Sequence, residues 1–287
     1  MNKTVLLTGG TGFVGRRLAS QLTDRGFFIR HVVRKGRAGE LPHDGAIESI
    51  IETADLFAEP VERCAEMCQG VDTVVHAAWY AEPGHYLVSD QNFACLTGSL
   101  NLGRGAAIAG VRRFVGIGTC FEYDTSAGTL STSTPLKPTT PYAATKAATF
   151  MILSAWLQLH HVAFAWCRLF YLHGEGEDDR RLVPYVRSRL RDGLPADLTT
   201  GDQVRDFLDV TQAAKLITDV VESDAEGPFN ICSGVPVTIR QLAETIADEF
   251  GRRDLLRFGA RSFNTTDPPV VLGEPNVPSG PKSQRLA

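Results

Sequence analysis

A tyrosine and a lysine four positions apart, Tyr142 and Lys146 in the run PYAATK, could exchange a proton with a carbonyl or hydroxyl oxygen. Residues at this spacing share one face of a helix. A phenol has an ordinary pKa of about 10, and a neighbouring ammonium group stabilises the phenolate and lowers that pKa toward neutral pH. Thr119, at the end of an apolar run, could hydrogen-bond the same oxygen. These residue types predict a catalytic set, Thr119, Tyr142 and Lys146, in which the phenol gives a proton to a ketone that accepts hydride.

A glycine-rich turn near the start of the chain could hold a pyrophosphate. The run TVLLTGGTGFVG (4–15) has Gly10, Gly12 and Gly15 at the spacing G-x-G-x-x-G, directly after an apolar strand-like run. Glycines here let the backbone turn tightly and bring the N-terminus of the next helix against the phosphates. The position of the motif predicts a dinucleotide-binding turn rather than a turn without a ligand.

A basic turn follows the second strand-like run. Arg34, Lys35 and Arg37 stand where an acidic residue commonly holds the ribose hydroxyls of NAD, and no Asp or Glu occurs between Asp24 and Glu40. A cation at this point can pair with the 2′-phosphate of NADP. We therefore expect NADP(H) as the cofactor, with Arg34 as its leading contact. NAD(H) is the alternative if these cations only face solvent.

Alternating elements are expected to position these residues. Strands are predicted at 4–8, 28–33, 46–51, 71–78, 112–119 and 162–170, and helices at 13–26, 61–70, 90–109 and 141–161. This alternation predicts the α/β class, a doubly wound parallel sheet of the Rossmann type.

The pattern changes from about residue 174 onward. A helix at 182–192, a strand at 203–210 and a helix at 213–223 are expected, and the final Pro- and Gly-rich residues are expected to be irregular over about the last 20 positions. We expect a dinucleotide-binding Rossmann domain at 1–173 and a smaller C-terminal substrate-binding lobe at 174–287, interleaved with the Rossmann sheet around 203–223.

Composition and charge exclude several classes of function. The net charge is −4 and the pI is near 6.0, so no basic surface for nucleic acid is expected. No run approaches the roughly 20 apolar residues that span a bilayer, and the apolar N-terminal run is too short for a signal peptide. The cysteines are scattered without metal-ligand spacing. We expect a cytoplasmic protein that has no metal site and no membrane association.

The motifs, taken in order, resemble the extended short-chain dehydrogenase/reductase family, in its NAD-dependent epimerase/dehydratase group. The resemblance spans residues 4–262 and is carried by TGGTGFVG, VVHAAW (74–79), Asn92, Thr119 before Tyr123, YAATK, RLFYLHGEG (168–176), QVRDF (203–207) and LRFGA (256–260). It implies that the cofactor contacts Gly9, Gly12, Phe13, Val14, Gly15, Arg34, Asp55, Leu56, Ala77, Ala78, Tyr142 and Lys146. It also implies catalysis by Thr119, Tyr142 and Lys146, with Asn92 as a supporting residue.

The resemblance further implies a nucleotide-sugar substrate. Arg205 would meet its diphosphate, a pairing that suits the guanidinium fork, and Trp79 and Cys120 are expected beside the sugar. Two departures matter. The 4,6-dehydratases of the family have Asp-Glu directly after the threonine, whereas Cys120 and Phe121 follow here, so dehydration is not expected. The arginine that relatives place after the FGA-like turn is out of register at Arg261.

The nucleotide-sugar 4-ketoreductases of the group are the most similar in these motifs. We therefore expect NAD(P)-dependent reduction of the 4-keto group of a nucleotide-linked deoxyhexose. A nucleotide-sugar epimerase with tightly bound NAD is the alternative, and a non-catalytic NADP-sensing regulator is disfavoured by the Tyr–Lys pair. The resemblance also implies a homodimer, formed through the apolar helices expected at 90–109 and 141–160.

Overall fold

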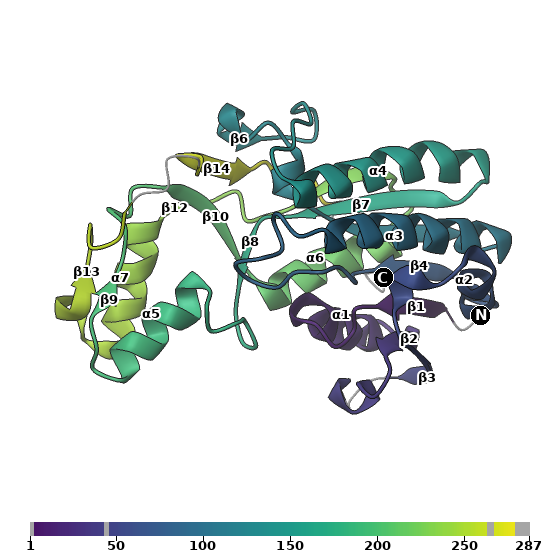
Figure 1. The fold of residues 1–287 in the computed structure, drawn as a ribbon, viewed down its shortest axis with the longest axis horizontal. Coiled ribbons are helices and arrows are strands. Elements are labelled where there is room, and N and C mark those ends of the chain that lie inside the picture. Colours follow the sequence, from purple (N-terminus) through teal and green to yellow (C-terminus); the bar gives the residue numbers. More distant parts are fainter. Residues whose placement is uncertain (1–2, 43–45, 263–266, 279–287) are drawn as a thin grey trace, which may run out of the picture.

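A parallel sheet of seven strands forms the centre of the computed structural model, which describes residues 3–42, 46–262 and 267–278 (Figure 1). Its strand order is β11-β7-β5-β4-β1-β2-β3. The bounds are Thr4–Thr8 for β1, Phe28–Arg34 for β2, Ile47–Thr53 for β3, Thr73–His76 for β4, Arg113–Thr119 for β5, Ala163–Leu169 for β7 and Gly227–Ile231 for β11. The order reverses direction at β1 and β4, so a ligand crevice is expected at the carboxyl ends of these strands. The predicted doubly wound Rossmann sheet is confirmed.

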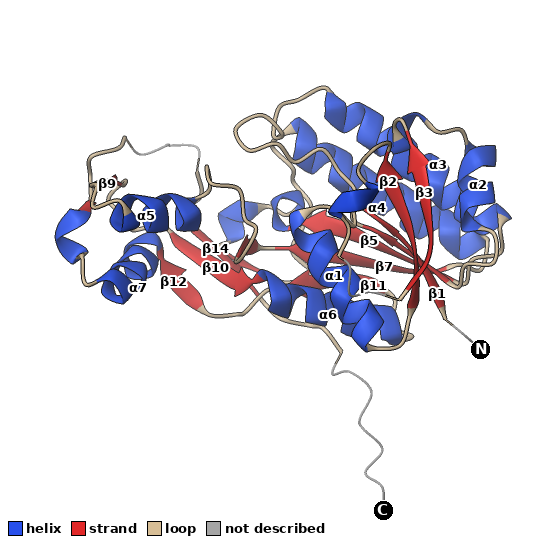
Figure 2. Ribbon diagram, turned by 90° about the horizontal axis from the view of Figure 1, so that it is seen from below, coloured by secondary structure: helices blue, strands red, loops and turns tan. Residues whose placement is uncertain are grey.

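Helices cover both faces of this sheet (Figures 1 and 2). On one face, α1 (Phe13–Asp24) and α6 (Val210–Glu222) bury an apolar core against the strands. On the other face, α2 (Val61–Cys68), α3 (Gln91–Ile108) and α4 (Pro141–Leu159) do the same. Every residue of β5 is buried, as the central position of this strand requires.

A smaller lobe lies beyond the carboxyl ends of the strands, at the left of Figure 1. Its main sheet has the order β12-β10-β14-β6, with β8 paired to β10. The bounds are Thr129–Leu130 for β6, Tyr171–His173 for β8, Val204–Asp209 for β10, Pro236–Thr238 for β12 and Val270–Gly273 for β14. Two helices, α5 (Leu182–Arg191) and α7 (Ile239–Phe250), form the core of the lobe beside the short pair β9 (Ala196–Asp197) and β13 (Leu256–Arg257).

Several elements differ from the sequence-based expectation. Helix α6 begins at Val210 rather than 213, because the Asp209 carboxylate accepts hydrogen bonds from the backbone N–H groups of Thr211 and Gln212. Helix α7, strand β11 and the short lobe strands were not predicted. The expectation of an irregular tail was wrong at β14, which pairs with β10 and β6. Residues 279–287 lie outside the described residues.

Candidate active site

A cleft of about 940 Å³ opens at the carboxyl ends of the central strands and continues to the small lobe. Its wall brings together the predicted catalytic, cofactor-binding and substrate-binding residues, whereas Gly10 and the supporting residue Asn92 are not part of it. The predicted residues on the wall are Gly9, Gly12, Phe13, Val14, Gly15, Arg34, Asp55, Leu56, Ala77, Ala78, Trp79, Thr119, Cys120, Tyr142, Lys146 and Arg205.

The glycine-rich turn packs too tightly for side chains. Gly9 has φ +74°, and a Cβ added there would lie 2.7 Å from the backbone nitrogen of Ala78. A Cβ on Gly15 would lie 2.0 Å from the carbonyl oxygen of Gly9. Gly12 is the N-cap of α1 and has no side chain to occupy the amides of the first helical turn. The turn is therefore a backbone cradle of the kind that receives a pyrophosphate.

The cations after β2 differ in their surroundings. The guanidinium of Arg37 donates to the carboxylate of Glu40 at 2.6 Å, and a nitrogen of Arg16 lies 3.7 Å from the same group. Arg34 is exposed on the cleft wall and forms no ion pair within the described residues. Lys35 is not part of the cleft wall, so Arg34 is the cation of this turn that lines the cleft and can meet a phosphate without breaking an ion pair.

The start of α4 sets the position of the Tyr–Lys pair. Thr140 caps the helix, since its Oγ1 accepts a hydrogen bond of 3.2 Å from the backbone N–H of Ala143, and Pro141 occupies the first turn. Tyr142 follows in this first turn, and Lys146 lies one turn later on the same face. Thr119 ends β5 at the same side of the cleft.

Lys146 is buried against β5 and the Trp79 ring. Its Nζ donates to the carbonyl oxygen of Ile117 at 2.6 Å and lies 3.7 Å from the ring centroid of Trp79. Burial lowers the pKa of Lys146 to about 7, against the opposing effect of the negative charge of Glu122. Burial raises the pKa of the Tyr142 phenol, while a hydrogen bond with Thr119 lowers it. The net change is upward, opposite to the lowering by Lys146 that the sequence predicted, so Tyr142 carries its proton at neutral pH, as a proton donor must.

Two aromatic rings flank Tyr142. The ring of Tyr86 packs edge-on to it at a centroid distance of 4.8 Å, and the ring of Trp79 does so at 6.5 Å. Asn92 lies behind this wall, where its Oδ1 accepts from Trp79 Nε1 at 2.9 Å and its Nδ2 donates to the carbonyl oxygen of Tyr86 at 2.6 Å. Asn92 thus ties the two flanking residues together. Tyr86 was missed by the sequence analysis, and no motif points to it.

The distal end of the cleft contains Arg205 in an existing ion pair. The guanidinium of Arg205 is buried and donates to the carboxylate of Asp267 at 2.7 Å. Cys120 is buried nearby on the cleft wall, and burial raises the pKa of its thiol, so it is not an acid–base group. Arg261 is not part of this wall; its guanidinium lies over the ring of Tyr185, 4.5 Å from the centroid. Asp267 was not predicted as a site residue.

A loop at residues 174–181 contributes to the wall of the cleft. Glu175 accepts from Arg17 of α1 at 2.8 Å, and Arg180 pairs with Glu82 on the opposite side at 3.2 Å. Between these contacts, Glu177 lines the cleft, and its buried Oε2 has no hydrogen-bond donor within the described residues. Burial raises the pKa of this carboxyl group to about 7.

Within residues 3–42, 46–262 and 267–278, no group of three or more His, Cys, Asp or Glu side chains is placed to hold a metal ion. Likewise, none of the helices in this part of the chain is both long enough and apolar enough to cross a membrane. All six cysteines are buried as free thiols.

The fold and the cleft define a dinucleotide-binding enzyme of the extended short-chain dehydrogenase/reductase type. The family model described as "NAD dependent epimerase/dehydratase family" matches residues 5–232, and the chain belongs to this family.

Curated relatives and solved structures agree with this assignment. The dTDP-6-deoxy-L-talose 4-dehydrogenase (NAD(+)) of Aggregatibacter actinomycetemcomitans is 24% identical, over 91% of this chain and 97% of the relative. The CDP-abequose synthase of Salmonella muenchen is 22% identical, over 91% and 85%. The UDP-N-acetylglucosamine 4-epimerase of Methanobrevibacter ruminantium has a similar fold, with a TM-score of 0.82, 23% identity, and coverage of 95% of this chain and 89% of the other. The UDP-glucose 4-epimerase of Thermus thermophilus, solved with NAD, has a TM-score of 0.79, 24% identity, and coverage of 95% and 90%.

Proposed function

We propose that this enzyme reduces the 4-keto group of a nucleotide-linked deoxyhexose, using NADP(H) in preference to NAD(H). The observation that carries the proposal is the joint position of Thr119, Tyr142 and Lys146 on a cleft that runs from the glycine cradle to Arg205. Two relatives support the choice of carbon: they are named as 4-dehydrogenases of a dTDP-linked 6-deoxy sugar, and oxidation at that position is the reverse of this reduction.

The residues present fit a nicotinamide dinucleotide. Gly9, Gly12 and Gly15 form a cradle that a Cβ would fill, and they would hold the pyrophosphate, with Asp55 and Leu56 toward the adenine. Phe13, Val14, Ala77 and Ala78 would line the same groove. When bound, the reduced nicotinamide supplies the hydride.

The remaining chemistry belongs to side chains of this protein. The Tyr142 phenol gives its proton to the keto oxygen, which becomes a hydroxyl group. Thr119 donates a hydrogen bond to the same oxygen, and the Lys146 ammonium group stabilises the phenolate that Tyr142 leaves. Trp79 and Cys120 would line the sugar, and Arg205 would meet the diphosphate. Residues 174–287, apart from the part that returns to the central sheet, would act as the substrate lobe.

Two other reactions of the family fit less well. Dehydration needs an acid and a base beside the threonine, and Cys120 and Phe121 provide neither. Epimerisation would use the same three residues with retained NAD, and the fold likeness to epimerases keeps it as the second candidate. Net consumption of the reduced cofactor distinguishes a reductase from an epimerase.

Removal of the proton donor tests the proposal. Tyr142→Phe is expected to lower kcat by roughly 10²- to 10⁴-fold while the Kd of the cofactor changes only a few-fold, because the hydroxyl acts only in proton transfer. Tyr80→Phe is the matched control, since it removes a phenolic hydroxyl from a residue that is not part of the cleft wall. Near-normal turnover by Tyr142→Phe would remove Tyr142 from the mechanism.

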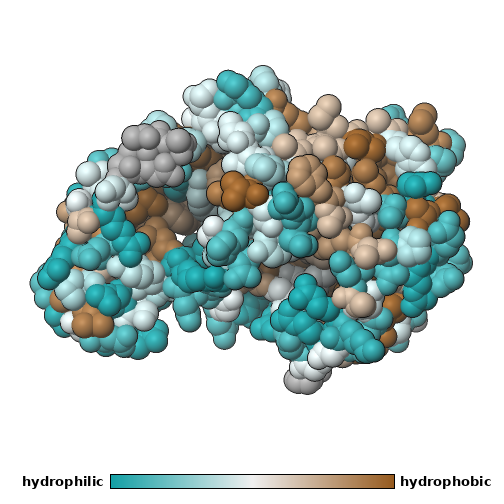
Figure 3. Space-filling model, viewed as in Figure 1, coloured by the Kyte–Doolittle hydropathy of each residue, from teal (hydrophilic) through white to brown (hydrophobic). Residues whose placement is uncertain are grey.

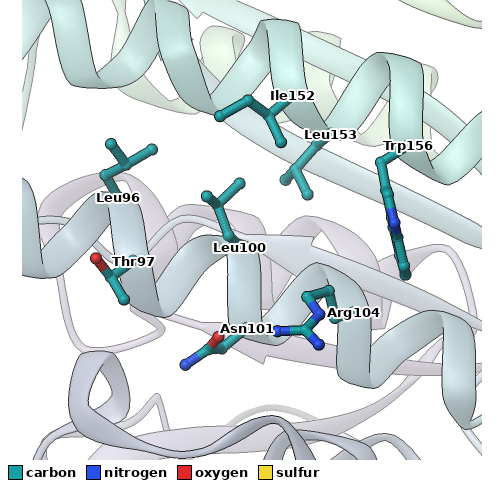
Figure 4. Close-up of a pocket in the computed structure, with 8 residues that line it drawn as sticks. All are labelled: Leu96, Thr97, Leu100, Asn101, Arg104, Ile152, Leu153 and Trp156. Carbon is teal, nitrogen blue, oxygen red and sulfur yellow. The ribbon is translucent and has the colours of Figure 1, made fainter.

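We also propose that the enzyme is a homodimer that associates through α3 and α4. Each of these long helices contains a single charged residue, Arg104 in α3 and the buried Lys146 in α4. Five large apolar side chains of these helices are exposed: Phe93, Ile108, Met151, Ile152 and Leu159. Brown and tan surface gathers over this part of the molecule, at the upper right of Figure 3. A groove of about 270 Å³ lies between the two helices, lined by Leu96, Leu100, Ile152, Leu153 and Trp156 together with polar neighbours (Figure 4).

A second copy of the same two helices would cover this apolar face. Sedimentation velocity is expected to give a dimer for the wild type and a monomer for Met151→Glu. Val235→Glu, which places the same charge on an exposed apolar residue elsewhere, should stay dimeric. A wild-type monomer at micromolar concentration would contradict the proposal.

A further inference from the structure

Two glycines in β5 open a space beside the catalytic threonine. A Cβ on Gly116 would lie 2.3 Å from Cζ3 of Trp166, and a Cβ on Gly118 would lie 2.2 Å from Nε1 of Trp166 and 2.4 Å from Oε1 of Glu122. Because both positions lack a side chain, the indole of Trp166 in β7 lies directly on β5. The side chain of Glu122, three residues after Thr119, folds back into the same space.

Glu122 is fully buried and fully partnered. Its Oε1 accepts hydrogen bonds from the backbone N–H of Thr119 at 2.8 Å and from Nε1 of Trp166 at 2.9 Å. Its Oε2 accepts from Nε of Arg168 at 2.7 Å, and Arg168 is itself buried. The guanidinium of Arg168 and these two N–H donors thus satisfy both oxygens of the buried carboxylate.

This arrangement holds Thr119 from two sides. The Thr119 N–H is bound by Glu122, while the Thr119 Oγ1 accepts from the backbone N–H of Phe121 at 3.3 Å, so the two residues form a capping box around a single helical turn. Because its oxygen accepts from Phe121, the Thr119 hydroxyl is the donor in its hydrogen bond with Tyr142, and it points its proton into the cleft beside that phenol. That proton is the one a keto oxygen in the cleft needs.

The other end of the arrangement is anchored in the core. Arg168 Nη1 donates to the hydroxyl of Tyr123 at 2.9 Å, and that hydroxyl donates to Oδ1 of Asn230 in β11 at 2.8 Å. The Arg168 guanidinium also lies over the rings of Tyr123 and Phe150. Glu122 is therefore attached to three strands of the central sheet, through Thr119, Arg168 and Asn230.

We propose that Glu122 is a positioning residue for Thr119: clamped by Arg168 and Trp166, it fixes the Thr119 backbone so that the threonine hydroxyl points its proton at the substrate oxygen. This inference rests on the proposed role of Thr119, but it holds for reduction and for epimerisation alike. It gives a function to the buried Glu122–Arg168 ion pair, which the roles of Thr119, Tyr142 and Lys146 alone do not explain. Glu122 acts through Thr119 and does not touch the substrate.

A double-mutant cycle tests this role. Glu122→Asp keeps the negative charge near Arg168 but shortens the side chain by one methylene, so it cannot reach both Arg168 and the Thr119 N–H. We expect kcat to fall by about 10- to 100-fold, with the Kd of the cofactor within about threefold of wild type. In the Thr119→Val background, the same change should lower kcat by less than about twofold, because the hydroxyl that Glu122 positions is already gone.

The controls separate positioning from general destabilisation. Asp219 in α6 is another buried carboxylate, and it pairs with Arg25 at 2.9 Å, away from the cleft. Asp219→Asn should therefore lower Tm and leave kcat unchanged. If Glu122→Asp does not fold, Glu122→Gln enters the same cycle. Any NAD(P)-dependent turnover of the wild type can serve as the assay. The test of Glu122 therefore remains valid even if the substrate is not a 4-keto sugar. Wild-type kcat in the Glu122 variant, or equal losses in both backgrounds, would overturn the proposal.

Discussion

The ammonium group of Lys146 lies 3.7 Å from the centroid of the Trp79 ring, so the face of the ring stabilises the charged lysine against the burial that lowers its pKa to about 7. A cation–π contact of about 1–2 kcal/mol corresponds to roughly one pH unit. Trp79→Leu and Trp79→Phe both remove the indole N–H, but only phenylalanine keeps an aromatic face. The alkaline limb of the pH–kcat profile, where charged Lys146 is lost, is expected about one unit lower in Trp79→Leu than in Trp79→Phe. Coincident limbs would mean that the ring face does not support the charge.

The Arg205–Asp267 pair predicts opposite effects from its two partners. Arg205→Ala should raise the KM of the nucleotide-sugar by about 10- to 150-fold, the loss of one charge-assisted contact. Asp267→Asn should lower this KM, because a diphosphate approaching Arg205 would no longer meet a carboxylate 2.7 Å from the guanidinium. Initial-rate kinetics would give both values, and the KM of the cofactor should stay constant in each variant. Parallel changes in the two variants would argue against a diphosphate at Arg205.

Arg34 is expected to determine the choice of cofactor. It is exposed on the cleft wall at the end of β2, whereas Arg37 is engaged by Glu40. One arginine–phosphate pair is worth about 1.5–3 kcal/mol, so Arg34→Ala should reduce the preference for NADP(H) by roughly 10- to 150-fold. Fluorescence titration of both cofactors into wild type, Arg34→Ala and the control Arg63→Ala would measure it. A wild type that prefers NAD, or a preference unaffected by Arg34→Ala, would favour the epimerase.

Glu177 predicts a pH-dependent effect on stability. Burial raises its pKa in the folded protein to about 7, so the folded state holds this proton more tightly than the unfolded chain. Its ionisation therefore costs stability as pH rises from about 4.5 to about 7, by about 1–2 kcal/mol after allowance for partial exposure.

Glu177→Gln cannot ionise and removes this cost. The difference in Tm between Glu177→Gln and wild type should thus be more positive at pH 8 than at pH 5, by about 2–4 °C. Glu175→Gln, an exposed neighbour in the same loop, should show no such difference. Equal Tm differences at the two pH values would show that Glu177 is not buried as described.

Most of the cleft could be predicted because its signals are local. The glycine turn, the Thr140 cap before Tyr142 and the four-residue spacing to Lys146 each lie within a few residues, and backbone geometry alone relates them. The spacing of Thr119 and Glu122 also predicts a capping box from the sequence alone, but the sequence analysis missed it. Helix α7 has a capping box as well, at Thr238 and Gln241, and was also missed.

Contacts between residues far apart in the sequence could not be predicted from local spacing. Arg205 meets Asp267 from 62 positions away, and Glu122 meets Arg168 from 46 positions away. No local spacing relates these residues, because only the pairing of β10 with β14, and of β5 with β7, brings their segments together. For the same reason β11 was not predicted: it is short, and only its place beside β7 makes it part of the central sheet.

Isotope transfer from the cofactor tests the central claim most directly. The enzyme would be incubated with NADPH deuterated at both C4 positions of the nicotinamide and with a nucleotide-linked 4-keto-6-deoxyhexose, and the product analysed by mass spectrometry and NMR. We predict one deuterium at C4 of the sugar for each cofactor oxidised, with the rate of transfer lowered by roughly 10²- to 10⁴-fold in Tyr142→Phe. Product formed without net cofactor oxidation, or deuterium at another carbon, would contradict the assignment as a 4-ketoreductase.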